Sequence, residues 1–186
     1  MQILNDDKFV TPEVVVMKDN LTTINTYTIK GKDGEEDRIV TDRTILVRFE
    51  PDSNAEHKGF LNKLATLENF QQTSVSRSTF ASTIKAAKSK NHDTGVYEAH
   101  ATKKTLNIKA PLDAGVAYLE KEGERFIEPL DTNIPFGSTV VLEGTVTKWP
   151  KGDGTFNGRR GVSLSVNKVR ILSRGLPQKT SSISTS

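Results

Sequence analysis

The 186-residue chain contains no cysteine. Disulfide bonds and thiolate metal sites are therefore excluded, and the sequence carries no mark of an oxidising compartment. No apolar run reaches the length that a membrane-spanning helix needs, and the first ten residues lack the basic and apolar regions of a signal peptide. From these absences we expect a soluble protein of the cytoplasm, with no membrane partner.

Sequence motifs of catalysis are also missing. The chain has no GxSxG, no glycine loop for phosphate and no HExxH. Its three histidines, His57, His92 and His100, fall in loop-like or strand-like settings without the spacing of metal ligands. The acidic residues are scattered, whereas a two-metal nuclease needs several carboxylates together. The sequence predicts a protein that is not an enzyme and that holds no metal or cofactor.

The charge is distributed unevenly along the chain. Hydrophobic residues make up only 34% of the sequence, and its length suits one well-buried core. From Gly144 to the end there are eight basic residues against one acid, Asp153, although the whole chain carries only +3. Two explanations fit this asymmetry equally well: an anionic partner that binds the C-terminal end, and a basic tail that is only solvated.

The first fifty residues favour extended structure. VTPEVVVMK and LTTINTYTIK are rich in β-favouring residues, and GKDGEED supplies the signals of a loop. RIVTDRTILVRF follows with Ile45, Val47 and Phe49 on one face. We expect a long β-hairpin.

The middle of the chain changes to helical spacing, which predicts a helical insertion over about 54–90. Ser53 or Asn54 would cap the first helix, whose apolar residues are Phe60, Leu61, Leu64, Leu67 and Phe70. A second helical run contains Phe80, Ile84 and Ala87. It ends in a basic stretch whose lysines, Lys85, Lys88 and Lys90, would oppose the helix dipole.

Strand patterns return from about residue 94, with a hairpin signal at Glu122–Gly123. The clearest pair is VVLEGTVTKW and GVSLSVNKVRIL, whose apolar residues alternate until Val166 and then shift phase at Val169. This shift predicts a β-bulge near Asn167, of the kind that lets a small sheet close into a barrel. We expect a mainly β chain with one domain over 1–173 and a disordered polar tail over 174–186.

A basic hairpin tip is the strongest functional signal. Unpaired nucleic acid offers phosphates to neutralise and base faces to stack upon, which suits cations interleaved with aromatics on a glycine-rich loop. Six residues within thirteen positions have this character: Lys148, Trp149, Lys151, Phe156, Arg159 and Arg160. Lys109, together with Lys103, Lys104, Tyr97 and Tyr118, would extend the surface. The alternative is that Trp149 packs under the barrel and the arginines only solubilise the loop.

The C-terminal third resembles a known family. FGSTVVLEGTVTKWP, the loop and RRGVSLSVNKVRIL are similar to the closing segment of phage single-stranded DNA-binding proteins of the short-tailed coliphage type. The preceding EKEGERFIEPLDTNIPFGS is similar to their lead-in, so the resemblance covers residues 115–173. It implies an oligonucleotide-binding (OB) barrel with one or two inserted helices. Such proteins commonly end in an acidic tail, whereas this chain ends in KTSSISTS.

The family implies a function as well as a fold. Its members coat and protect single-stranded DNA in phage DNA replication and recombination, promote annealing, recruit polymerase or helicase and often form homodimers, all in the host cytoplasm. Our hypothesis is therefore sequence-independent binding of single-stranded DNA. The alternatives are a structural β-barrel, such as a virion component, and an RNA-binding barrel, which the residues alone do not separate from a DNA-binding one.

Overall fold

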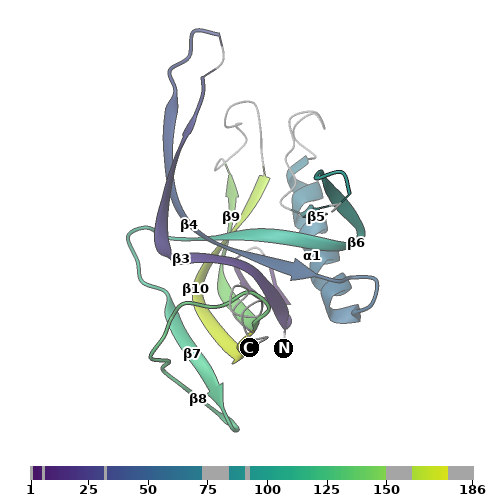
Figure 1. Cartoon of the computed structure of the whole chain (residues 1–186), viewed down its shortest axis with the longest axis vertical. Helices are drawn as coiled ribbons and strands as arrows, with labels where there is room; N and C mark the ends of the chain where they lie inside the picture. Colours follow the sequence, from purple (N-terminus) through teal and green to yellow (C-terminus); the bar gives the residue numbers. More distant parts are fainter. Residues whose placement is uncertain are drawn as a thin grey trace.

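The computed structural model describes residues 2–5, 7–31, 33–72, 84–90, 93–149 and 161–175, and for some of these only the backbone. These described residues form one helix and ten strands (Figure 1): β1 Ile3–Leu4, β2 Lys8–Val10, β3 Val14–Ile29, β4 Arg38–Phe49, α1 Ala55–Gln72, β5 Lys85–Lys90, β6 Tyr97–Ala110, β7 Ala117–Glu122, β8 Arg125–Ile127, β9 Thr139–Trp149 and β10 Gly161–Ser173.

Five of the strands close into a barrel in the order β3-β4-β6-β10-β9, with β9 returning to β3. The β6–β10 pairing is parallel, and the other pairings in the ring are antiparallel. In chain order this is a ring of strands 1-2-3-5-4, which is the connectivity of the OB barrel. The mainly β, OB-like fold expected from the sequence is confirmed.

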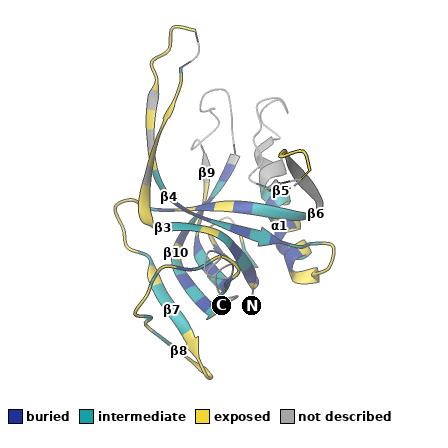
Figure 2. Cartoon of the chain, viewed as in Figure 1, coloured by how far each residue is buried: buried dark blue, intermediate teal, exposed yellow. Residues whose placement is uncertain are grey.

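The barrel core follows the predicted alternation (Figure 2). Ile45, Val47 and Phe49 point inward and are fully buried, which confirms the face predicted for β4. The buried residues of the last two strands are Val140, Leu142, Val146, Val162, Leu164, Val166, Val169 and Ile171. The register of β10 against β9 shifts between Val166 and Lys168, so the predicted bulge lies at Asn167.

Helix α1 covers the barrel and begins where the sequence predicts. The Asn54 side chain caps it, because Oδ1 accepts hydrogen bonds from the backbone N–H groups of Glu56 (3.0 Å) and His57 (3.1 Å). Phe60 is fully buried and stacks on Phe49 with ring centroids 5.6 Å apart. The helix packs against β10 and β1. It is not apolar enough to cross a membrane, and the described part of the chain has no other helix.

The second predicted helix is wrong where the structure describes it. Residues 85–90 form β5, which pairs antiparallel with β6, and residues 73–83, including Phe80, lie outside the described part. Alanine and lysine favour helix locally, but pairing with an adjacent strand overrides a weak propensity. The lysines of KAAKSK therefore lie on a strand, and the interpretation of their charge as support for a helix end fails.

Two hairpins project from opposite ends of the barrel. The outer part of β3 and β4 forms a two-stranded arm at one end, and β7 with β8 forms a shorter projection at the other (Figure 1). The described chain continues past β10 through Arg174 and Gly175. Residues 176–186, which make up most of the predicted tail, lie outside the described residues.

Candidate nucleic-acid interface

The predicted hairpin tip falls largely outside the described residues. Lys151, Phe156, Arg159 and Arg160 belong to the 150–160 segment. The backbone of Lys148 and Trp149 is described at the end of β9, where residue 149 pairs with Gly161. The assignment of these residues to nucleic-acid contact therefore remains a prediction. Of the predicted set, only Lys109 has a described side chain, and it is exposed on β6.

Lys109 lies at the edge of a groove on the outer face of β3, β4 and β6. The register brings Lys109 opposite Thr44 and Asn107 opposite Leu46. Because alternate residues of these strands fill the core, their neighbours are left on the outer face. The groove has a volume of about 370 Å³. Its lining is mostly polar and consists of Lys18, Asn20, Tyr27, Asp42, Thr44, Leu46 and Asn107.

Tyr27 brings an aromatic ring to this groove from the arm. Its side chain is 46% exposed, and its hydroxyl donates a hydrogen bond to Oδ2 of Asp42 at 3.3 Å. A tethered, half-exposed ring beside amides, a hydroxyl and lysines can stack on an unpaired base and bind its backbone. Sequence reasoning missed this role, although Tyr27 precedes a glycine-rich loop between strands, the kind of loop that OB barrels use for binding.

The base of the arm is fixed by a buried joint. Four residues of β3, 21–24, face the single residue Arg43 of β4, and Leu21 is fully buried. The Asp19 carboxylate accepts hydrogen bonds from the backbone N–H groups of Leu21 and Ile134, both at 2.9 Å. Arg43 donates to the carbonyl of Leu21 at 3.4 Å and to two carbonyls in the 111–114 loop. The arm therefore leaves the barrel at a defined angle and holds Tyr27 over the groove.

Tyr118, which the sequence offered as an extension of the binding surface, belongs to this joint. It packs partly buried against the core. Burial, followed by the nearby negative charge of Asp19, raises the pKa of Tyr118 to about 12, while Arg43 acts in the opposite direction. Its ring supports the base of the arm and is not displayed beside Tyr27.

Two cations of the basic C-terminal segment are used inside the fold. Arg170 pairs with Glu143, and its guanidinium lies 6.0 Å from the centre of the Phe126 ring. Arg174 makes two hydrogen bonds of 3.0 Å to the Glu120 carboxylate. The hydrogen bond from Arg174 holds the pKa of Glu120 below its usual value. The charge asymmetry of the sequence therefore overstates the charge available to a partner.

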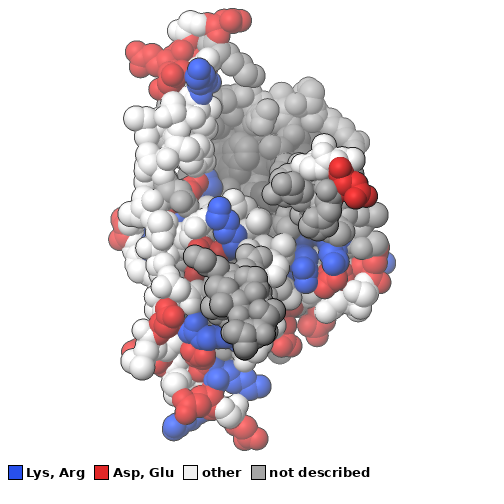
Figure 3. Space-filling view, in the orientation of Figure 1, with Lys and Arg blue, Asp and Glu red and all other residues white. Residues whose placement is uncertain are grey.

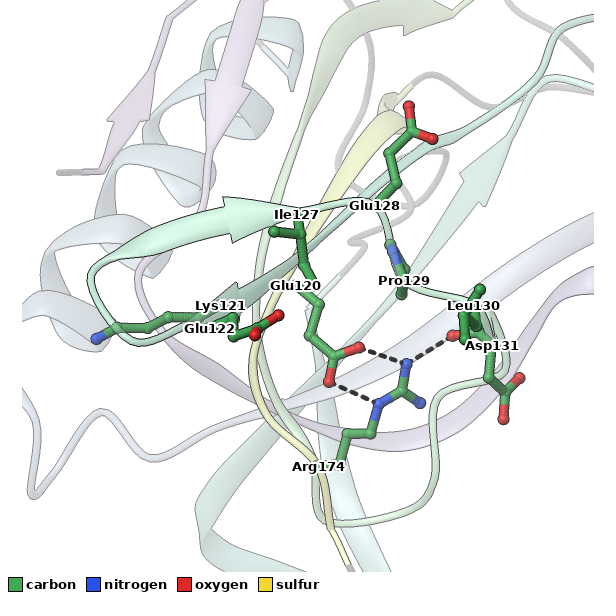
Figure 4. Close-up of a pocket in the computed structure, with 9 residues that line it drawn as sticks. All are labelled: Glu120, Lys121, Glu122, Ile127, Glu128, Pro129, Leu130, Asp131 and Arg174. Carbon is green, nitrogen blue, oxygen red and sulfur yellow. Dashed lines mark hydrogen bonds and ion pairs between the residues drawn. The ribbon is translucent and has the colours of Figure 1, made fainter.

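A larger hollow, of about 450 Å³, lies beside the β7–β8 hairpin (Figure 4). Arg174 crosses it to reach Glu120 and the carbonyl of Asp131, which accepts at 2.5 Å. Four of the lining residues are acidic and two are basic. An acidic excess repels phosphate, so this hollow does not suit a polyanion.

The one histidine with a described side chain has a structural role. His57 lies in the first turn of α1, not in the loop or strand expected for the histidines. Its Nδ1 accepts a hydrogen bond from the N–H of Glu50 at 3.0 Å, and Nε2 donates to the carbonyl of Glu13 at 2.6 Å. Elsewhere in the described residues no three His, Asp or Glu side chains gather as metal ligands would.

Comparison with known proteins finds similarity in structure and not in sequence. No family model and no curated protein sequence matches the chain. The single-stranded DNA-binding protein gp2.5 of bacteriophage T7 is similar, with a TM-score of 0.59 and 6% identity over 95% of this chain and 89% of that one. The single-stranded DNA-binding protein of bacteriophage Enc34, solved in complex with single-stranded DNA, gives 0.54 and 12% over 96% of both chains.

These likenesses show that the chain shares its fold with these two phage proteins. A further structure of the Enc34 protein gives a TM-score of 0.55 at 11% identity, over 96% of this chain and 90% of that one. The resemblance seen in the sequence over 115–173 is thus confirmed in the fold and extends to nearly the whole chain.

Proposed function

We propose that this protein binds single-stranded DNA without sequence preference and protects it during phage DNA replication and recombination. The observation that carries the proposal is the polar groove on β3, β4 and β6, with Tyr27 at one end and Lys109 at its edge. Its amides and hydroxyl can bond to any nucleotide, and the ring can stack on any base. The fold shared with the two phage proteins supports the same function.

The C-terminal hairpin would complete the interface. In an OB barrel the loop between the first two strands and the loop between the last two flank the binding face. Here these are the arm and the 150–160 segment. Trp149 and Phe156 would stack on bases, while phosphates would be neutralised by Lys109, Lys148, Lys151, Arg159 and Arg160.

The biological setting follows from this activity. The protein would act in the host cytoplasm as a non-enzymatic coat on single strands, and by holding bases exposed it would promote annealing. Homodimerisation and contacts with a polymerase or helicase fit this setting.

A fluorescence titration tests the proposal directly. Trp149 is the only tryptophan, so its emission reports on one predicted contact. We expect oligothymidylate to quench this emission, with an affinity that falls as the salt concentration rises. In a plot of the logarithm of the binding constant against the logarithm of the salt concentration, each phosphate contact should contribute about 0.7 to the downward slope. Duplex DNA and RNA of equal length should bind more weakly. An affinity for single strands that salt does not change, or no binding at low salt, would refute the proposal.

Tyr27 provides a sharper test of the groove. Stacking is worth about 1–3 kcal/mol per base, so Tyr27→Ala should weaken binding by roughly 5-fold to 150-fold while Tyr27→Phe keeps most of the affinity. The matched control is Phe126→Ala, which removes a 39% exposed aromatic ring from the opposite end of the barrel and should leave binding unchanged. Equal effects of Tyr27→Ala and Phe126→Ala would contradict a role for the groove.

A further inference from the structure

The β5–β6 hairpin concentrates positive charge that the fold leaves unexplained. Residues 85–104 contain five lysines against two acids, Asp93 and Glu98. Three of these lysines lie on β5, where no helix end exists for them to stabilise. The other two, Lys103 and Lys104, are half-buried on β6, and no described carboxylate forms an ion pair with either. Clustered like charges repel each other, so a structural reason for this cluster is lacking.

This hairpin is continuous with the candidate groove. One half of β6 pairs with β4 and carries Asn107 and Lys109, and its other half pairs with β5. Lys103 precedes Asn107 by four residues, which is about 13 Å along a strand, and it lies on the same outer face, whereas Lys104 lies opposite the buried Phe49 on the inward face. The register also places residue 85 of β5 opposite Thr105. A single strand leaving the groove along β6 would therefore pass directly onto the hairpin.

The two other projections contain more acids than cations. Four acids against three cations lie in residues 30–38, at the tip of the arm, and five acids against two cations lie in residues 120–131, around the β7–β8 hairpin. Figure 3 shows acidic side chains at both of these ends of the molecule. A polyanion is repelled from either end, so among the described projections the β5–β6 hairpin is the one that attracts it. The exposed acids of the tip are Asp33, Glu35, Glu36 and Asp37.

We propose that the β5–β6 hairpin is a second subsite, which binds the phosphodiester backbone of a single strand beyond the groove. The inference rests on the proposed function and adds the direction of the strand, from the arm across β4 and β6 toward β5. Recognition here is by charge, through Lys103 together with the lysines of β5. The subsite lengthens the stretch of DNA that one molecule covers.

The double substitution Lys85→Gln and Lys103→Gln, at two positions that the register places on the outer face, tests this subsite on two lengths of oligothymidylate. We use about 5 and about 25 nucleotides, because one OB fold covers about 4–16. On the long oligonucleotide the salt slope should fall by about 1.4, since each lost contact removes about 0.7, and the affinity near 0.1 M salt should fall about 25-fold. On the short oligonucleotide, which the groove alone can hold, both quantities should stay as in the unmodified protein.

The matched control removes two exposed cations elsewhere, by Lys121→Gln and Arg125→Gln on the β7–β8 hairpin. This control should leave the affinity and the salt slope unchanged for both oligonucleotides. Thermal melts should show that both double variants fold. If the lysine variant and the control variant have the same salt slope on the long oligonucleotide, the proposal of a second subsite is wrong. Equal losses on both lengths would also overturn it, because the lysines would then belong to the groove. Failure of the unmodified protein to bind either oligonucleotide would instead refute the proposed function.

Discussion

Gly144 of β9 lies where three strands meet, and replacing it with alanine should strongly destabilise the barrel. The residue pairs with Val166 of β10 on one side and with Phe9 of β2 on the other. A Cβ added there would lie 1.8 Å from the carbonyl oxygen of Ser165 and 2.9 Å from the Phe9 ring. A glycine inside a strand often marks such a close approach.

The size of the effect follows from the overlap. Real Cβ atoms essentially never approach another heavy atom within 3.0 Å, so the Ser165 carbonyl must retreat by about 1.2 Å. The clash is with backbone, which no side-chain rotation can relieve. Overpacking costs typically 1–3 kcal/mol, and we expect Gly144→Ala to reach at least about 3 kcal/mol. For a domain of this size that lowers Tm by about 6–12 °C.

Urea unfolding followed by far-ultraviolet circular dichroism measures this change. The control is Gly115→Ala, because a Cβ at Gly115 meets no atom within 4 Å. Fewer conformations of the unfolded chain should leave that variant unchanged or stabilised by up to about 1 kcal/mol. If Gly144→Ala unfolds at the same urea concentration as Gly115→Ala, the close packing of β9 on β10 described above is wrong.

Three further predictions concern the buried polar groups. His57→Phe should cost about 2–4 kcal/mol in urea unfolding, because two partly buried backbone groups lose their hydrogen-bond partner, and a loss below about 0.5 kcal/mol would contradict this. In an absorbance titration of tyrosinate, Tyr118 should ionise near pH 12. Because this folded pKa lies above the unfolded value of 10, the stability that Tyr118 contributes is complete below pH 10 and is lost as pH rises from 10 to 12. If every tyrosine ionised near pH 10, the raised pKa of Tyr118 would be excluded. Arg43→Ala should weaken single-strand binding several-fold with an unchanged salt slope, because Arg43 positions the arm without touching phosphate; a smaller slope would show direct contact.

The barrel strands were predictable because their signal is local. Alternation with period two identifies the inward face of a strand whatever its neighbour is, so Ile45, Val47 and Phe49 were placed correctly. The phase break after Val166 is likewise visible in the sequence, and it located the bulge at Asn167. The first helix had both a cap and a repeating apolar face.

The errors and omissions share a non-local cause. Residues 85–90 became a strand through pairing with β6, which the composition of KAAKSK does not indicate. The groove joins Tyr27 of β3, Thr44 of β4 and Asn107 of β6, and alternation does not say which strands are neighbours. Arg174 looked like a free cation because its partner Glu120 is 54 residues away.

The order in which the strands close the barrel has a consequence for the synthesis of the chain. The strands that close the barrel, β9 and β10, are synthesised after β3, β4 and β6, and β9 must pair with β3, more than a hundred residues earlier in the chain. Until then β3, β4 and β6 can form only an open sheet with unpaired edges. Contacts so distant in sequence slow folding, so the nascent protein stays vulnerable to wrong edge-to-edge pairing until β9 and β10 have been made.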